Sequence, residues 1–220
     1  MTRLHAEPRG TLRVNLPMSF GLLHIASAVP DFMAAYPEIN LDLTLDDRVV
    51  DVVDEGYDIV IRITDLPDSS LIARRLAPFH IATCAAPVYW DAHGRPRHPG
   101  ELRNHACLLY SYLSNLNEWR YRGPDGPFAV RVDGPLRGNN GEMLRTAALA
   151  GRGVIRSPTF IVGCDLQTGR LERVLTEFEE EDRGIYAVYP HNRHLSAKVR
   201  AFVDFMAGRF ADPEWDRPAA

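Results

Sequence analysis

The sequence predicts an α/β protein of two lobes, and three features of its 220 residues carry this prediction. Strand and helix patterns alternate through the first third of the chain, as in folds built on a parallel sheet. Ile59, Val60 and Ile61 form a contiguous apolar run, which is typical of a strand buried on both faces of such a sheet. Two strands far apart in the chain end at Pro87 and Pro190. We therefore expect two lobes joined by two crossing strands.

The chain begins with a strand, a helix and a second strand. Residues 11–16 alternate as a strand, and residues 20–36 carry apolar side chains at helical spacing. Pro30 lies inside the helical pattern, so a kink or a break is expected there. Alternation in residues 39–45 is the clearest strand pattern of the sequence and leaves one face of that strand in water.

A short helix is predicted before the buried strand. Asp46 or Asp47 caps this helix and Gly56 ends it. Its core side consists of Val49, Val50 and Val53. The buried strand follows at residues 57–63, so the order is strand, helix, strand, helix, strand, with right-handed crossovers.

Short local patterns predict the remaining elements. A helix at 141–150 offers core side chains from Met143, Leu144, Ala147 and Ala148. The last helix carries an apolar stripe made of Leu195, Val199, Phe202, Val203 and Met206. The other expected elements are strands at 71–76, 80–85 and 185–189, a hairpin of 119–122 with 128–132, a strand that starts at Val154, and a helix at 160–166.

The predicted lobe boundaries follow from composition. Between Pro87 and Pro99 the chain is rich in proline, glycine and histidine, which is typical of a segment between domains. We place lobe I at 11–86 and 190–212 and lobe II at 87–189. Residues 213–220 are rich in proline and charge and are expected to form a frayed tail.

Composition excludes several functional classes. The formal net charge is −4 and no lysine or arginine run forms a basic face, so direct nucleic-acid binding by this chain is not expected. No apolar run reaches the roughly 20 residues that a membrane span needs, and no secretory signal precedes residue 10. Three widely separated cysteines argue against a disulfide framework or a zinc site and suit the cytoplasm. No cofactor or metal is expected.

Five blocks of sequence, spread from Gly10 to Phe210, point to one protein family by their order and spacing. The first, residues 10–21, reads Gly-Thr-Leu-Arg-Val-Asn-Leu-Pro-Met-Ser-Phe-Gly, and the last, 153–169, includes Pro-Thr-Phe-Ile-Val. The other blocks are residues 32–41, 54–63 and 68–76. Together they resemble the effector-binding domain of LysR-type bacterial transcription regulators.

The resemblance implies a fold and a set of partners. The family fold is that of type II periplasmic binding proteins, two Rossmann-like α/β lobes around a ligand cleft. It implies a small-molecule effector, a homodimer or, at full length, a tetramer, and promoter DNA bound through a winged helix-turn-helix that this chain lacks. Residues 1–10 resemble the end of the linker helix that would connect the two halves.

Two loops are expected to bind the effector, because in α/β folds ligands lie beyond the carboxyl ends of the strands. Each loop leads into a helix N-terminus, whose free N–H groups favour an anion such as a carboxylate. In the resemblance, the two loops face one another across the cleft. Asn139 and Asn140 are also good helix caps, and this alternative stays open. The predicted contacts are Pro17, Met18, Ser19 and Phe20 in the first loop and Asn139 and Asn140 in the second.

Further ligand contacts are predicted outside these two loops. Arg62 has two interpretations, because it either binds the effector or pairs with Asp58 or Asp65. Arg156 stands where the family usually has an apolar residue. Our hypothesis is that it neutralises an acidic effector, and the alternative is that it lies on the lobe surface or pairs with Glu142. The remaining predicted contacts are Thr64, Cys84, Tyr112 and Thr159.

The function predicted from these features is effector sensing rather than catalysis. An alternative within the same fold is a stand-alone solute-binding receptor, which would need a secretory or lipid signal. A third possibility, an enzyme, would need a nucleophile, a base or a metal in the cleft, and we find no such set of residues.

Overall fold

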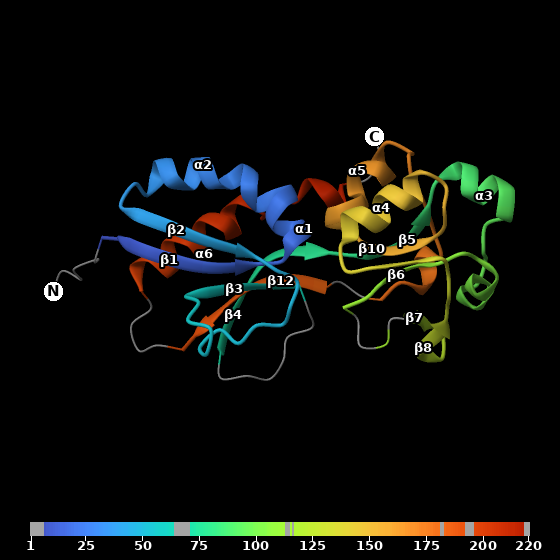
Figure 1. The fold of residues 1–220 in the computed structure, drawn as a ribbon, viewed down its shortest axis with the longest axis horizontal. Coiled ribbons are helices and arrows are strands. Elements are labelled where there is room, and N and C mark those ends of the chain that lie inside the picture. Colours follow the sequence, from blue (N-terminus) through green and yellow to red (C-terminus); the bar gives the residue numbers. More distant parts are fainter. Residues whose placement is uncertain are drawn as a thin grey trace. The chain divides into compact units, whose positions relative to one another are not determined.

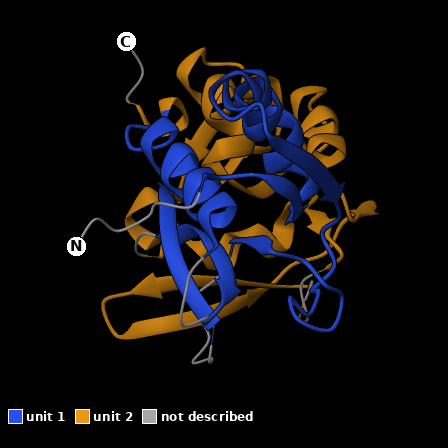
Figure 2. Ribbon diagram, turned by 90° about the vertical axis from the view of Figure 1, so that its left-hand side faces the viewer, with its two compact units in different colours: residues 1–78, 183–213 blue, residues 79–182, 214–220 orange. Residues whose placement is uncertain are grey.

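The computed structural model describes residues 7–63, 71–112, 115, 117–180, 183–191 and 196–217. The chain divides into two compact units, coloured separately in Figure 2. Unit 1 comprises Met1–Pro78 and Arg183–Pro213, and unit 2 comprises Phe79–Asp182 and Glu214–Ala220. These boundaries differ from the predicted ones, so the strand around residue 83 belongs to unit 2 and the strand around residue 187 to unit 1.

Unit 1 is built on one five-stranded sheet in the order β2-β1-β3-β12-β4 (Figure 1). β1 pairs in parallel with β2 and with β3, whereas β12 runs antiparallel to β3. The apolar run of β3 is buried, as predicted, with Ile59 0%, Val60 2% and Ile61 2% exposed. The strands are β1 (Gly10–Leu16), β2 (Ile39–Leu45), β3 (Ile59–Ile63), β4 (Leu71–Phe79) and β12 (Arg183–Pro190).

The first helix of unit 1 is continuous from Met18 to Ala35. It comprises α1 (Met18–Phe20), a π-helical turn η1 (Gly21–Ile25) and α2 (Ala26–Ala35), and it continues through Pro30 without a break. Phe32 packs edge-on against Phe202 of the last helix, α6 (Ala197–Arg209), with ring centroids 5.3 Å apart. The predicted helix is therefore present, and its core contact is with α6.

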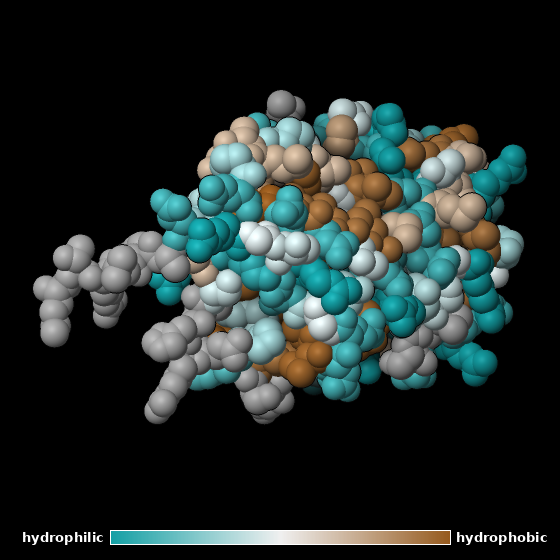
Figure 3. Space-filling model, turned by 60° about the vertical axis from the view of Figure 1, so that its left-hand side comes forward, coloured by the Kyte–Doolittle hydropathy of each residue, from teal (hydrophilic) through white to brown (hydrophobic). Residues whose placement is uncertain are grey.

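The same helix is 18 residues long with a mean hydropathy of 1.3, so by length and composition alone it could cross a membrane. This corrects the expectation that no apolar stretch approaches that length. Core helices of soluble proteins meet the same criterion, and this one buries Ala28 and Phe32 within unit 1. Its outer side leaves Leu22, Leu23 and Met33 at 57%, 40% and 54% exposure. On the face of the molecule drawn in Figure 3, hydrophobic side chains lie in patches among hydrophilic ones.

The prediction of a short helix between residues 46 and 56 is wrong, because this segment forms turns. The Asp51 carboxylate accepts hydrogen bonds from the backbone N–H groups of Val53 and Asp54, at 2.8 and 2.9 Å. Such local bonds compete with the helix ladder. Val50 and Val52 are buried instead, whereas the predicted core residues Val49 and Val53 are 91% and 63% exposed.

Unit 2 contains a three-stranded antiparallel sheet with β5 at its centre, flanked by β10 and β11. The predicted hairpin is confirmed as β7 with β8, and β6 pairs in parallel with β9. The strands are β5 (Ile81–Ala85), β6 (Leu108–Tyr110), β7 (Glu118–Gly123), β8 (Gly126–Arg131), β9 (Leu136–Gly138), β10 (Ile155–Pro158) and β11 (Glu172–Val174).

The helices of unit 2 surround two apolar clusters. One cluster includes Trp90, Trp119 and Tyr121, and the other includes Leu144, Ala148 and Val162. Met143, expected in the core, is 67% exposed. The helices are α3 (Pro87–His93), η2 (Pro99–Asn104), α4 (Gly141–Leu149), α5 (Thr159–Gln167), η3 (Thr176–Phe178) and η4 (Glu214–Asp216).

The residues expected to form a frayed tail belong to unit 2 from Glu214 onward, and for residues 214–217 the expectation is wrong. Trp215 is 7% exposed, and its ring lies edge-on to Phe160 of α5 with centroids 6.5 Å apart. The Gln167 side-chain amide donates hydrogen bonds to the carbonyl oxygens of Glu214 and Arg217, at 2.8 and 3.0 Å. Apolar burial and two hydrogen bonds therefore hold this segment on α5.

Candidate functional site

The first predicted loop lies at the start of the Met18–Ala35 helix, directly after β1. Pro17 occupies the N-cap position, and the Met18 backbone N–H donates a 2.8 Å hydrogen bond to Oδ1 of Asp47. Ser19 and Phe20 are buried, at 6% and 0% exposure. A carboxylate of the protein itself thus occupies this helix N-terminus, where the peptide dipoles favour negative charge.

Two ligand contacts were predicted at the end of β3, Arg62 and Thr64, and the structure describes only Arg62. Arg62 donates a 2.7 Å hydrogen bond through Nη2 to the carbonyl oxygen of Val50, so it anchors the turn segment that follows β2. Asp58, one of its two expected partners, is instead 2.7 Å from Nζ of Lys198. Thr64 and Asp65 lie outside the described residues.

In unit 2, the second predicted loop is used to start α4. The Asn140 side-chain oxygen accepts a 3.0 Å hydrogen bond from the Met143 N–H, and its amide donates to Glu142 at 3.1 Å. Asn139 is exposed and donates to the hydroxyl of Tyr112 at 3.3 Å. Asn140 is therefore a helix cap, the alternative that its residue type left open, and Asn139 lies beside another predicted contact.

Arg156 on β10 already has a carboxylate partner. Its Nη2 lies 2.9 Å from Oε2 of Glu180, and its guanidinium lies over the ring of Tyr121, 5.3 Å from the centroid. The side chain is 12% exposed. The predicted alternative partner, Glu142, is bonded to Asn140 instead. An acidic effector at Arg156 would therefore have to compete with Glu180.

Cys84 and Thr159 lie in the interior of unit 2. Cys84 is fully buried in β5, and burial raises the pKa of its thiol far above the ordinary value. Thr159 is 2% exposed at the start of α5, and its hydroxyl oxygen accepts a 3.0 Å hydrogen bond from the His80 N–H. Of these two, Thr159 contacts a cavity.

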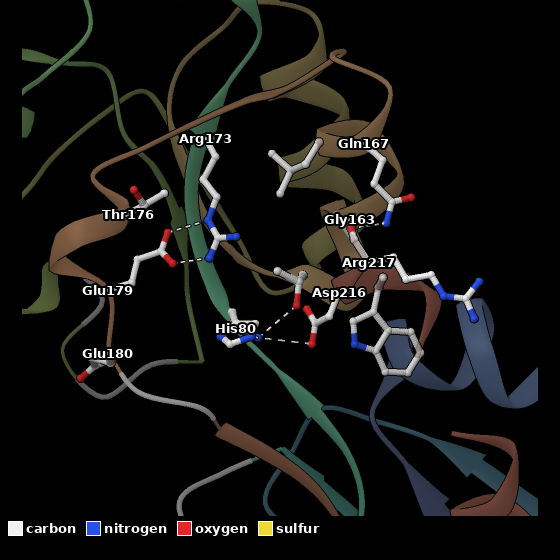
Figure 4. Close-up of a pocket in the computed structure, with 12 residues that line it drawn as sticks. His80, Gly163, Gln167, Arg173, Thr176, Glu179, Glu180, Asp216 and Arg217 are labelled. Carbon is white, nitrogen blue, oxygen red and sulfur yellow. Dashed lines mark hydrogen bonds and ion pairs between the residues drawn. The ribbon is translucent and has the colours of Figure 1, made fainter. Parts of the chain in front are cut away.

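The cavity has a volume of about 550 Å³, and all of its lining residues belong to unit 2 (Figure 4). This volume is within the range of small-molecule sites. One wall is α5, a second is the segment after β11 that includes Glu179 and Glu180, and a third is the C-terminal segment with Trp215 and Asp216. Among the described residues that the sequence predicted as ligand contacts, Thr159 alone lines it.

Sequence reasoning missed the charged side chains of this cavity. Arg173 forms a two-point pair with Glu179, in which Nε donates to Oε1 at 2.7 Å and Nη2 donates to Oε2. His80 and Asp216 come from segments 136 positions apart, with Nε2 and Oδ2 separated by 4.0 Å. A tryptophan in a charged tail is a signal for packing that could have pointed to Trp215, but local patterns do not reveal the other residues.

Comparison with known proteins places the whole domain in one family. The LysR substrate binding domain family matches residues 5–211. The HTH-type transcriptional regulator DmlR of Escherichia coli K12 is 35% identical over 206 residues, 93% of this chain and 67% of DmlR. An HTH-type transcriptional regulator of Haemophilus influenzae is 33% identical over 199 residues, 90% of this chain and 69% of its own length.

Solved structures agree with these sequence matches. The regulatory domain of CrgA, a LysR-type transcriptional regulator from Neisseria meningitidis, superposes with a TM-score of 0.80 at 29% identity, covering 92% of this chain and all of that one. Full-length AphB, the Vibrio cholerae virulence activator, gives 0.79 at 28% identity over 91% of this chain and 69% of AphB. The chain therefore belongs to the LysR substrate-binding domain family, the effector-binding domains of LysR-type transcription regulators, which share a type II periplasmic-binding-like fold and are not enzymes.

Proposed function

We propose that this domain senses a small acidic metabolite in the cytoplasm and thereby controls a DNA-binding half carried elsewhere in the regulator. One observation carries the acidic class of the effector. The Met18 N–H at the first predicted loop already binds a carboxylate, that of Asp47, at 2.8 Å. The backbone N–H donor and the helix dipole that bind the Asp47 carboxylate would bind the carboxylate of an effector in the same way.

In this proposal, Asp47 is a competitor that the effector displaces. Asp47 belongs to the turn segment after β2, and Arg62 holds the same segment through Val50. Displacement of Asp47 would free one contact of that segment while the Arg62 contact remains. A ligand shifts a conformational equilibrium only by its difference in affinity between two states, and exchange of Asp47 for the effector provides such a difference.

A thermal-shift screen of small carboxylates against their matched amides tests the proposed effector class. An acid at about 100 times its dissociation constant should raise the stability by roughly 2.7 kcal/mol, which is several degrees for a domain of this size. The matched amide should give no shift at the same concentration. A panel in which amides or neutral sugars stabilise the domain and acids do not would refute the acidic class but not the family.

Replacing Asp47 by alanine should strengthen the binding of any acid found in that screen, because the Met18 N–H then has no internal carboxylate. The ligand-free domain should lose about 1 kcal/mol of unfolding free energy, the usual cost of losing an N-terminal helix cap. Urea denaturation and isothermal titration calorimetry measure the two effects. Asp54→Ala, which removes an exposed carboxylate of the same segment, is the matched control and should change neither value. Equal affinities in wild type and Asp47→Ala would exclude this loop as the acid site.

We further propose that the domain forms a homodimer and that the regulator binds promoter DNA through a winged helix-turn-helix. The exposed Leu22, Leu23 and Met33 on one helix supply an apolar surface for the dimer. A strictly monomeric domain in sedimentation velocity at micromolar concentration would contradict this surface. The stand-alone receptor is not favoured, because the matched relatives are transcription regulators. That the effector lies between the two lobes remains a prediction from the resemblance, and its contact with Thr159 remains a prediction from the position of this residue after Pro158.

A further inference from the structure

The cavity in unit 2 contains several charges that are already neutralised by partners. The Arg173 guanidinium is paired with Glu179, and Glu180 is paired with Arg156. Arg217 lies 3.9 Å from Glu214, its side chain is 53% exposed, and in Figure 4 its guanidinium points away from His80. These pairs account for two of the three carboxylates that line the cavity.

The third carboxylate, Asp216, is different. Both of its oxygens are covered from solvent, and neither accepts a hydrogen bond within the described part of the chain. The His80 imidazole, which is charged only when protonated, has its Nε2 atom 4.0 Å from Oδ2, beyond hydrogen-bond distance. A buried acceptor without a donor is unfavourable, so a group that brought N–H donors to these oxygens would bind there.

Packing and hydrogen bonds of the neighbouring residues fix Asp216 in place. Trp215 is buried against Phe160, and Gln167 holds the backbone on both sides of Asp216 through Glu214 and Arg217. The backbone of Trp215 approaches α5 so closely that a Cβ at Gly163 would lie 2.4 Å from its carbonyl oxygen. The unsatisfied carboxylate is therefore part of a packed wall rather than of a loose terminus.

We propose that this cavity is a second ligand site, separate from the loop at Met18, and that it binds a small molecule with a protonated primary amine. The ammonium group donates to Oδ1 and Oδ2 of Asp216, and the indole of Trp215 adds an aromatic wall that favours a cation. His80 acts as the gate. Its side chain is 36% exposed, so it has room to turn aside and uncover the carboxylate.

The test uses the whole 220-residue chain and propylammonium chloride as the probe, followed by calorimetry and by amide chemical shifts in NMR. We expect saturable binding, with shifts at the amides of residues 163–167 and 214–217. Propanol and potassium chloride at equal concentration should produce neither effect. Propionate should not bind at this cavity, since it brings no donor to Asp216.

Asp216→Asn should weaken the binding of propylammonium about tenfold or more, the usual effect of losing a charge-assisted hydrogen bond. The matched control is Glu214→Gln, which removes an 88% exposed carboxylate of the same segment and should leave affinity unchanged. His80→Ala should act in the opposite direction and tighten binding, because the gate is removed. This increase would not arise from a general loss of structure.

Three outcomes would overturn the proposal: no saturable binding of propylammonium, equal affinities in wild type and Asp216→Asn, or binding of propionate with the same chemical-shift pattern. Acid binding at the Met18 loop has its own readouts, in the amides near residue 18 and in the Asp47→Ala variant. Failure at one site therefore leaves the other result intact.

Discussion

Replacing Asp165 by alanine is expected to cost about 3 kcal/mol of unfolding free energy, the low end of the range for breaking a buried ion pair. Asp165 lies on α5 and its side chain is 1% exposed. It accepts a hydrogen bond from Nη2 of Arg145 on α4 at 2.9 Å, and it lies 2.6 Å from Nη2 of Arg170. The carboxylate also raises the pKa of the Arg145 guanidinium through its hydrogen bond. Removing it leaves a partly buried cation without its partner.

The loss should be greater than that from either arginine alone. Arg170 is 58% exposed, so Arg170→Gln should cost less than about 1 kcal/mol, as for other surface pairs. Asp165→Asn keeps the shape of the side chain and should lie between the two. Urea denaturation of the three variants measures their losses of unfolding free energy and so gives the order of these losses. If Asp165→Ala were no more destabilising than Arg170→Gln, the buried pair would contribute nothing beyond a surface contact.

This pair also joins the two helices whose starts carry predicted ligand contacts. α4 begins after Asn140 and α5 begins at Thr159, and the Arg145–Asp165 pair fixes one helix against the other within unit 2. We therefore expect Asp165→Ala to broaden the NMR signals of both helix starts, even under conditions where most molecules remain folded.

The regular elements were predictable because their signals are local. Residues 39–45 alternate without interruption, and the structure has the strand β2 over the same residues. The glycines at 123 and 126 flank a two-residue turn, and the hairpin forms there. In both cases the local sequence pattern favours the same structure as the tertiary packing. Local pattern and fold therefore do not conflict at these positions.

The predicted lobe boundaries differ from the bounds of the two compact units, and the two local meanings of proline contribute to this difference. Between Pro87 and Pro99 the composition suggests a linker, but Pro87 occupies the first position of α3 and Pro99 the first position of η2. Proline suits the first turn of a helix, where its missing N–H is not needed. A count of prolines therefore cannot separate a linker from two closely spaced helix starts.

The candidate sites were harder to predict, since their residues meet only through the fold. Arg156 is correctly placed on a strand, but its partner Glu180 is 24 positions away and no pattern connects them. The same holds for Met18 and Asp47, which are 29 positions apart. The sequence predicted anion sites at two helix starts, and in the structure the protein's own Asp47 carboxylate lies at one of them.

Gly163→Ala is expected to detach the C-terminal segment from α5 and cost about 0.5–2 kcal/mol of unfolding free energy. The new Cβ would lie 2.4 Å from the carbonyl oxygen of Trp215 and 2.9 Å from its Cα. Both atoms belong to backbone, so no flexible side chain can move away. Relief requires the segment to shift, which exposes Trp215 and loses the 1.5–3 kcal/mol typical of burying a large side chain. The higher helix propensity of alanine, about 1 kcal/mol, offsets part of this.

Tryptophan fluorescence and urea denaturation measure the two effects together. Trp90 and Trp119 are buried elsewhere in unit 2, so a red shift and greater acrylamide quenching in Gly163→Ala would report Trp215. The matched control is Gly208→Ala in α6, where a Cβ meets nothing within 4 Å. That variant should gain about 0.5–1 kcal/mol from helix propensity and leave the fluorescence unchanged.

The same glycine variant separates two roles of the C-terminal segment. If the segment forms a wall of the amine cavity, its release removes Asp216 from the site, and Gly163→Ala should lose propylammonium binding while remaining folded. Binding of acids at the Met18 loop depends on residues of unit 1 and should persist. A Gly163→Ala protein with unchanged fluorescence and unchanged amine affinity would mean that α5 and the segment tolerate the added methyl group, and that their close approach does not hold the cavity together.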